Sequence, residues 1–265
     1  MRVNRVEQFL GDGWKVLPAG GVTGEAYIAQ QGEQTVFLKR NSSPFLAVLS
    51  AEGIVPKLLW TRRLENGDVV TAQRLLKGRE LKAYEMKQDR VASLLAKIHN
   101  SSELLAMFKR IGNEPLTPYR IVENLKLQLQ THHVVNDLVI EKAMKYLVNK
   151  LDVVRFHHYV VCHCDINHNN WMLDEEDQLF LVDWDGAKVA DPAIDLGLLL
   201  YSYITEAEWE DWLAQYGVEL DHSLRERMHW YVVSQSISVL IWHLERKQFD
   251  EVEQLKGYLN SLLPS

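Results

Sequence analysis

The stretch that most constrains this chain is residues 160–185, which reads VVCHCDINHNNWMLDEEDQLFLVDWD. It has the pattern of an apolar strand, a polar loop, a short strand, an acidic turn and a second apolar strand. The loop contains Asp165 and Asn170, and Asp183 follows the last apolar run. Phosphoryl transfer to a hydroxyl needs one group that orients the nucleophile and two that hold magnesium. We therefore interpret Asp165 as a candidate catalytic base and Asn170 and Asp183 as candidate Mg²⁺ ligands.

Each of these residues also has an ordinary structural explanation. Asp and Asn are common turn residues, so Asp165 could cap the loop and Asn170 could stabilise a turn. Asp183 could belong to a solvated strand end. The joint spacing favours the functional interpretation, because D-x4-N, a hairpin and an apolar run ending in Asp rarely coincide by accident.

The N-terminal part of the chain is predicted to be a small antiparallel β region. Two pairs of β-forming segments are each joined by a glycine turn, and the second turn is Asn66-Gly67, a strong hairpin signal. A short helix is expected between the two hairpins. The β region begins at residue 14, and the stretch 18–24 separates its first candidate strand from the next. In chain order, the other expected strands and the helix are residues 25–30, 35–40, 44–51 (the helix), 57–62 and 68–73.

A glycine-rich turn precedes the first hairpin, and a lysine lies near the end of the hairpin's second strand. The turn contains Gly20, Gly21 and Thr23. Backbone N–H groups in such a turn can approach a phosphate because no Cβ lies in the way. Lys39 ends the run TVFLK and could pair with phosphate oxygens as a point charge. Taken alone, the turn is as well explained by a plain loop and Lys39 by a surface lysine.

Helical patterns dominate after Gly78. Residues 91–98 repeat apolar side chains at i, i+3, i+4 and i+7, which predicts a helix buried on one face. The sequence thus predicts an α+β fold with a small β-rich lobe of residues 1–76 and a mainly helical lobe of residues 77–265. The second lobe would contain the loop 163–170 and the acceptor site. Its other expected helices are residues 140–151, 192–203, 206–216, 224–245 and 251–262.

Charge and composition exclude several classes of protein. The formal charge of −7 provides no basic footprint for nucleic acid. It does not exclude a nucleotide, whose phosphates a metal and a local loop can neutralise. The sequence contains no run of about 18 apolar residues, so no membrane-spanning helix is expected. The N-terminus lacks the apolar core of a secretory signal. Cys162 and Cys164 are expected to stay reduced, which favours a cytoplasmic protein.

Zinc binding is an alternative for the loop, because Cys162, His163, Cys164 and His168 are close in sequence. Structural zinc sites usually contain a second ligand pair further along the chain, and no such pair follows here. We therefore disfavour zinc and expect His163 to support the loop. The sequence also lacks the G-x-S-x-G pattern of many serine hydrolases.

Aromatic residues are concentrated in the C-terminal part of the chain. Aromatic faces bind quaternary ammonium ions such as choline, and acidic residues lie nearby between positions 206 and 211. Helical spacing favours core packing for these rings instead. Amines, aminoglycosides and ribose- or nucleoside-like sugars all remain candidate acceptors. The aromatic residues are Trp209, Trp212, Tyr216, Trp230, Tyr231 and Trp242.

The chain resembles the aminoglycoside phosphotransferase and choline/ethanolamine kinase superfamily. The match comprises H-x-D-x4-N within residues 163–170, DWD at 183–185 and DPAIDL at 191–196. Weaker matches in the glycine turn, FLK and LAKIH extend it over residues 18–196. The runs HCDINHNNW and DWDGA look like those of the LicA/YtmP-like and CcrZ-like phosphotransferases of Gram-positive bacteria.

This resemblance implies a bilobal protein-kinase-like fold and an ATP- and Mg²⁺-dependent kinase. The acceptor would be a hydroxyl of a small molecule, choline/ethanolamine-like or aminoglycoside-like. The resemblance places the adenine against a hinge at residues 73–77. The implied roles are base for Asp165, Mg²⁺ ligands for Asn170 and Asp183, phosphate contact for Lys39, glycine-loop contacts for Gly20, Gly21 and Thr23, and adenine contacts for Gln73 and Leu75.

One departure from the family favours a different function. Family members usually carry a glutamate on the small-lobe helix that pairs with the strand lysine. Here the early turns of that helix lack a glutamate, and Glu52 lies at its end. The alternative is a kinase-like binding scaffold with a protein partner and a role in cell-cycle regulation.

Overall fold

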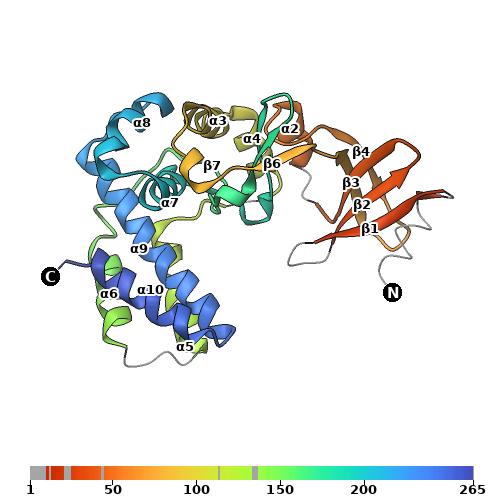
Figure 1. Ribbon diagram of the computed structural model, residues 1–265. Coiled ribbons are helices and arrows are strands. Elements are labelled where there is room, and N and C mark those ends of the chain that lie inside the picture. Colours follow the sequence, from red (N-terminus) through yellow and green to blue (C-terminus); the bar gives the residue numbers. More distant parts are fainter. Residues whose placement is uncertain are drawn as a thin grey trace. The chain divides into compact units, whose positions relative to one another are not determined.

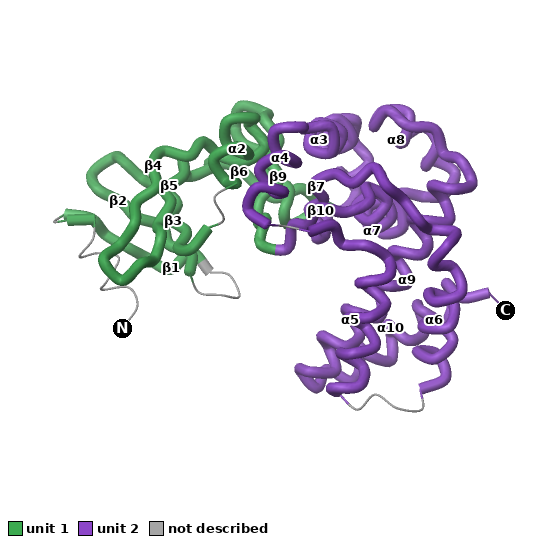
Figure 2. Tube along the Cα trace, turned by 180° about the vertical axis from the view of Figure 1, so that it is seen from behind, with its two compact units in different colours: residues 1–82, 168–185 green, residues 83–167, 186–265 purple. Residues whose placement is uncertain are grey.

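The computed structural model describes residues 10–11, 13–20, 25–42, 45–112, 114–132 and 137–264. The fold is α+β, as predicted (Figure 1). The chain divides into two compact units, coloured separately in Figure 2. Unit 1 comprises Met1–Lys82 and His168–Asp185, and unit 2 comprises Ala83–Asn167 and Gly186–Ser265.

Unit 1 contains a five-stranded antiparallel sheet with the order β1-β2-β3-β5-β4. Both hairpins expected from the sequence are present, and their turn residues Gly32 and Gly67 have φ values of +59° and +88°. Glycine adopts this left-handed region without the steric cost of a Cβ. The strands are β1 (Lys15–Gly20), β2 (Ala26–Gln31), β3 (Gln34–Arg40), β4 (Leu58–Arg63) and β5 (Val69–Arg74), and α2 (Leu46–Ala51) follows β3.

A second, three-stranded sheet in unit 1 decides where the chain divides. Its order is β6 (Gly78–Glu80), β8 (Trp171–Asp174) and β9 (Leu179–Leu181). The backbone N–H of Leu181 also donates to the carbonyl of Ile54 at 3.0 Å. This pairing places residues 77–82 and 168–185 in unit 1, whereas the small lobe expected from the sequence ended at residue 76. The loop 163–170 is shared between the units rather than contained in one.

Gly78 allows β6 and β8 to approach closely. A Cβ at this position would lie 2.2 Å from the carbonyl oxygen of Leu173. We expect Gly78→Ala to lower the free energy of unfolding by about 2 kcal/mol, since the backbone must shift. The matched control is Gly257→Ala in the helix α10 (Phe249–Leu262), where nothing lies within 4 Å of an added Cβ. There helix propensity predicts a gain of up to about 1 kcal/mol. Denaturant unfolding measures both, and equal changes would contradict the packing argument.

Unit 2 is mainly helical and is built around α7, most of whose residues are buried. The long helix α9 packs on α7 at Gly197, where a Cβ would lie 2.8 Å from the carbonyl oxygen of Met228. A short antiparallel pair, β7 (Val160–Cys162) and β10 (Lys188–Ala190), leads into and out of the central stretch. The helices are α3 (Asp89–His99), α4 (Ser102–Arg110), α5 (Pro118–Thr131), α6 (Leu138–Asn149), α7 (Ala193–Tyr203), α8 (Trp209–Tyr216), α9 (His222–Glu245) and α10 (Phe249–Leu262).

Most of the expected helices are found within a few residues of their expected ends. Four elements were not predicted from the sequence, namely α4, α5 and the three-residue strands β6 and β10. Within the described part of the chain, no helix combines the length and apolar character needed to cross a bilayer.

Candidate active site

Asp183 and Asn170 lie at the same end of the β8–β9 hairpin in unit 1. Asn170 ends the short 3-10 helix η2 (His168–Asn170), and its carbonyl accepts the backbone N–H of Val182 at 2.8 Å. Asp183 follows with a φ of +63°, a region that Asp and Asn adopt more readily than other non-glycine residues. Its side chain is 57% exposed, so its carboxylate can accept a further ligand. Carboxylate and amide oxygens are the donors Mg²⁺ prefers, so this set fits the ion.

Lys39 in β3 is held by two carboxylates of unit 1. Its Nζ lies 3.3 Å from Oδ1 of Asp183 and 2.8 Å from Oδ1 of Asp185. Asp185 belongs to the 3-10 helix η3 (Trp184–Gly186). From the sequence alone it had no assigned role, although two carboxylates in D-x-D spacing are a signal that could have indicated one. The structure thus joins a candidate metal ligand to the candidate phosphate contact.

Glu52 is the C-cap residue of α2, and its backbone N–H donates within that helix. Two carboxylates that contact Lys39 are those of Asp183 and Asp185. The DWD segment therefore supplies acidic partners for the lysine.

The other nucleotide-side candidates are spread along the first sheet. Gly20 ends β1, while Gly21 and Thr23 lie outside the described residues. Gln73 is the penultimate residue of β5, and its buried side-chain amide donates to the carbonyl of Pro56 at 3.0 Å. Leu75 is half-buried just after β5. The Gln73 side chain is therefore used within the fold, and the residue pairs with Phe37 of β3 and Leu58 of β4 in the sheet.

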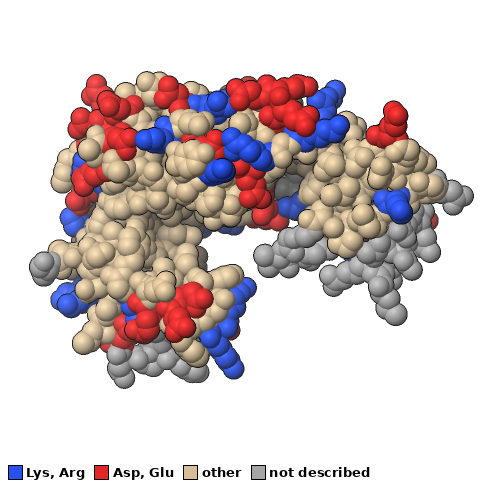
Figure 3. Space-filling model, in the orientation of Figure 1, with Lys and Arg blue, Asp and Glu red and all other residues tan. Residues whose placement is uncertain are grey.

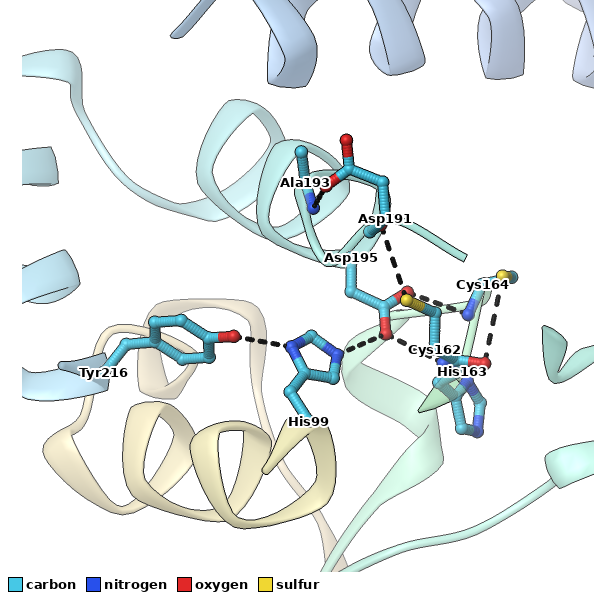
Figure 4. Close-up of polar contacts among 8 residues, drawn as sticks. All are labelled: His99, Cys162, His163, Cys164, Asp191, Ala193, Asp195 and Tyr216. Carbon is cyan, nitrogen blue, oxygen red and sulfur yellow. Dashed lines mark hydrogen bonds and ion pairs between the residues drawn. The ribbon is translucent and has the colours of Figure 1, made fainter. Parts of the chain in front are cut away.

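Asp165 belongs to unit 2 and is exposed. The two residues before it are held by Asp195, which is wholly buried in the first turn of α7 (Figure 4). Its carboxylate accepts the backbone N–H of His163 at 2.7 Å and of Cys164 at 2.8 Å. Cys164 has a φ of +64°, a costly conformation for a cysteine. These two hydrogen bonds thus stabilise a strained backbone next to Asp165.

Asp195 is part of a larger buried network that residue-by-residue reasoning did not find. His99 ends α3, and its Nε2 lies 3.1 Å from Oδ2 of Asp195. Its Nδ1 lies 2.7 Å from the hydroxyl of Tyr216, at the end of α8 (Figure 4). His99 and Asp195 belong to the segments LAKIH and DPAIDL that resemble the family, but no role was predicted for either residue. The position of His99 on the buried face of its helix, four residues after Leu95, was a signal for a structural histidine.

Asp191 begins the D-P-x-x-D-L segment, and its carboxylate accepts the backbone N–H of Ala193, the first residue of α7, at 2.9 Å. It also forms a buried ion pair with Arg227 of α9. Burial raises the pKa of the Asp191 carboxyl, and the neighbouring Arg227 opposes that rise only in part. Arg227 in turn covers the ring of Phe156 at 4.0 Å. These contacts anchor the helix that carries Asp195.

His99, Cys162 and Asp195 place ligand-type atoms within 4.8 Å of one another. The His99 and Asp195 atoms are already used in hydrogen bonds with each other, with Tyr216 and with the main chain. Burial raises the pKa of the Cys162 thiol well above its usual range, which opposes the thiolate that zinc requires. The chemistry of this cluster therefore fits a hydrogen-bonded core better than a metal site.

The aromatic residues of the C-terminal part belong to the core, as their spacing favoured. Trp209, Trp212, Tyr216, Trp230 and Tyr231 are all buried. Trp242 is 45% exposed, and the guanidinium carbon of Arg246 lies 3.7 Å from the centroid of its ring. Among the residues described, these rings do not form an open cage for a quaternary ammonium ion.

On the face of unit 2 that Figure 3 shows, acidic and basic side chains are interspersed. Several of these side chains form ion pairs with a neighbour of opposite charge, such as Lys87 with Glu208 and Lys150 with Glu226. This face therefore carries no single basic patch.

A profile of the phosphotransferase enzyme family matches residues 16–231 of this chain. The chain belongs to this family. The phosphotransferase is thus an enzyme that transfers a phosphoryl group, and the matched region contains all the candidate catalytic, metal-binding and nucleotide-binding residues discussed above.

Solved structures similar to this phosphotransferase confirm the kinase-like fold. Choline kinase LicA from Streptococcus pneumoniae is 19% identical, with a TM-score of 0.70 over 98% of this chain and 96% of that one. A choline/ethanolamine kinase family protein from Mesorhizobium loti is 16% identical, with a TM-score of 0.70 over 100% and 93%. The GDP complex of wild-type aminoglycoside 2'-phosphotransferase-IIIa is 17% identical, with a TM-score of 0.66 over 96% and 95%. At these identities the likeness shows the fold alone.

Proposed function

We propose that this protein is an ATP- and Mg²⁺-dependent kinase that phosphorylates a hydroxyl of a small molecule, choline/ethanolamine-like or aminoglycoside-like. The observation that carries the proposal is the cluster of Lys39, Asp183 and Asp185 beside the Asn170 loop. A purine nucleotide is supported by relatives solved with AMP and with GDP. The two cysteines are free thiols, which fits the cytoplasmic location that we propose.

In this proposal the residues of unit 1 bind the nucleotide. Lys39 pairs with α- and β-phosphate oxygens, and Asn170 and Asp183 would hold Mg²⁺, which when bound neutralises charge on the phosphates. The glycine turn with Gly20, Gly21 and Thr23 covers the phosphates through backbone N–H groups. The backbone of Gln73 and Leu75 faces the adenine.

Asp165 acts on the acceptor in this proposal. Its carboxylate accepts a hydrogen bond from the acceptor hydroxyl and aims that oxygen at the γ-phosphate. A carboxylate is a weak base toward a free alcohol, so it takes the proton late, as the new bond to phosphorus forms. The hydrogen bonds that the backbone N–H groups of His163 and Cys164 donate to Asp195 keep Asp165 in place.

Asp185 is expected to keep Lys39 aligned when Asp183 is directed to the metal. We expect Asp185→Asn to raise the KM for nucleotide about twofold to fivefold, since an exposed ion pair contributes only about 0.5–1 kcal/mol. The KM for the acceptor should not change. Initial-rate kinetics with both substrates varied measures this, and an unchanged nucleotide KM would remove Asp185 from the site.

A sugar-type acceptor, ribose- or nucleoside-like, is the second candidate. It is favoured by the burial of the C-terminal aromatic residues, because these rings are not available to bind a quaternary ammonium ion. The discriminating experiment is a screen of ADP release from ATP and Mg²⁺ with amines, aminoglycosides, sugars and nucleosides. Turnover with one class identifies the acceptor. Tight nucleotide binding without turnover on any acceptor would instead support a kinase-like scaffold with a protein partner.

A further inference from the structure

The hydrogen-bond chain behind Asp165 begins at a tyrosine on a helix remote in sequence. Tyr216 is 8% exposed, stacks on Trp212 at 6.2 Å, and places its hydroxyl 2.7 Å from Nδ1 of His99. The ring of His99 then reaches Asp195 through Nε2 (Figure 4). A hydroxyl at this position can therefore influence the loop before Asp165 through two intermediaries.

The proton positions in this series of hydrogen bonds follow from which groups can donate and which can only accept. The backbone N–H groups of His163 and Cys164 can only donate, and both point at the carboxylate of Asp195. A carboxylate can only accept, so Nε2–H of His99 donates the third hydrogen bond to Asp195. In a neutral ring Nδ1 is then an acceptor, and the Tyr216 hydroxyl must donate to it.

Burial supports the same arrangement. It raises the pKa of the Tyr216 phenol far above its usual range, so the hydroxyl remains a donor. His99 is 5% exposed and Asp195 is wholly buried, so water cannot readily replace a missing donor. Without the hydroxyl, Nδ1 would be an unsatisfied buried acceptor.

We propose that Tyr216 is a positioning residue whose hydroxyl fixes the neutral Nε2–H tautomer of His99. This tautomer donates to Asp195 and sets the orientation of the carboxylate that holds the strained backbone before Asp165. The positioning role rests on the proposed function, in which Asp165 orients the acceptor hydroxyl. The assignment of the tautomer does not rest on it.

The chain contains a matched control. The hydroxyl of Tyr146 makes the same bond, at 2.8 Å, to Nδ1 of His229. That pair joins α6 to α9 and, through Nε2 of His229, to the carbonyl of Leu262. Tyr146→Phe therefore removes the same kind of hydrogen bond from a place that is not linked to Asp195.

The first measurement is ¹⁵N NMR of histidine-labelled wild-type protein, with His99 assigned by comparison with His99→Gln. We expect a protonated Nε2 and an unprotonated Nδ1. The Nδ1–H tautomer or a doubly protonated ring would overturn the proposal. This readout needs neither turnover nor a folded Tyr216→Phe variant, so it stands apart from the proposed function.

The second measurement is the kinetics of Tyr216→Phe and Tyr146→Phe with ATP and the acceptor found in the screen. We expect Tyr216→Phe to lower kcat about tenfold with an unchanged KM for ATP and an altered His99 spectrum, since a small misplacement of an orienting group is costly. Tyr146→Phe should keep wild-type kcat. Equal kcat in the two variants would overturn the positioning role, whereas absence of turnover in the wild type would count against the proposed function alone.

Discussion

Asp165→Asn is expected to lower kcat about 1,000-fold, the scale of a lost general base together with its orienting role. Asparagine keeps the size of the side chain, so the loss reports on the carboxylate. The dissociation constant for Mg²⁺ and ATP should change less than twofold, because the proposed role of Asp165 is to act on the acceptor. Stability should stay within about 0.5 kcal/mol of wild type, as usual for an exposed position.

Coupled measurement of ADP release gives the rate, and isothermal titration gives nucleotide affinity. The control is Asp152→Asn, which neutralises an exposed aspartate of unit 2 whose Oδ1 pairs with Arg155 at 2.9 Å. That variant should turn over like wild type. If Asp165→Asn retained more than a tenth of wild-type kcat, Asp165 would not be the base.

Asp183→Asn is expected to weaken binding of Mg²⁺–ATP about 100-fold, because the charged oxygen of the proposed metal pair is lost. Asparagine is the informative replacement, since it tolerates the φ of +63° at this position, whereas alanine would add backbone strain. Titration of activity with Mg²⁺ at fixed ATP should show partial recovery at high metal concentration.

Asp177→Asn is the matched control, because Asp177 has the same φ of +63° and is exposed in the β8–β9 turn of the same unit. It should bind nucleotide like wild type. Asp183→Asn also removes one partner of Lys39, and Asp185→Asn separates this effect. High Mg²⁺ is expected to restore part of the activity of Asp183→Asn and none of the activity lost in Asp185→Asn. An Asp183→Asn enzyme with wild-type metal dependence would exclude Asp183 as a ligand.

Local signals located most of the fold. The two hairpins of the first sheet follow from β-forming runs around glycine turns, and the helix over residues 91–98 follows from its apolar period. The start of α5 also had a local signal that was overlooked, since Thr117 caps the helix and Pro118 occupies its first turn. Ser101 similarly caps α4.

The strands β6 and β10 could not be found in this way. Each has three residues, too few for a periodic pattern, and each exists because a distant segment pairs with it. The division of the chain into units has the same origin, because the pairing of β6 with β8 carries residues 168–185 into unit 1. Local patterns contain no information on such partners.

The sequence by itself determined the chemistry that this protein can offer. The spacing of Asp165, Asn170 and Asp183 along one strand–loop–hairpin stretch predicts phosphoryl transfer. An antiparallel hairpin brings residues just before its first strand and just after its second strand to the same end, as for Asn170 and Asp183. It also favoured core packing for the C-terminal aromatic residues, which the structure confirms.

Only the tertiary structure decided the partners of these groups. Lys39 meets Asp185 across 146 residues of sequence, and Asp195 reaches the backbone of Cys164 across 31. The physical reason is that such contacts depend on which strands pair and which helices pack, and these are collective outcomes of burying apolar surface. The residues before and after each group do not specify them.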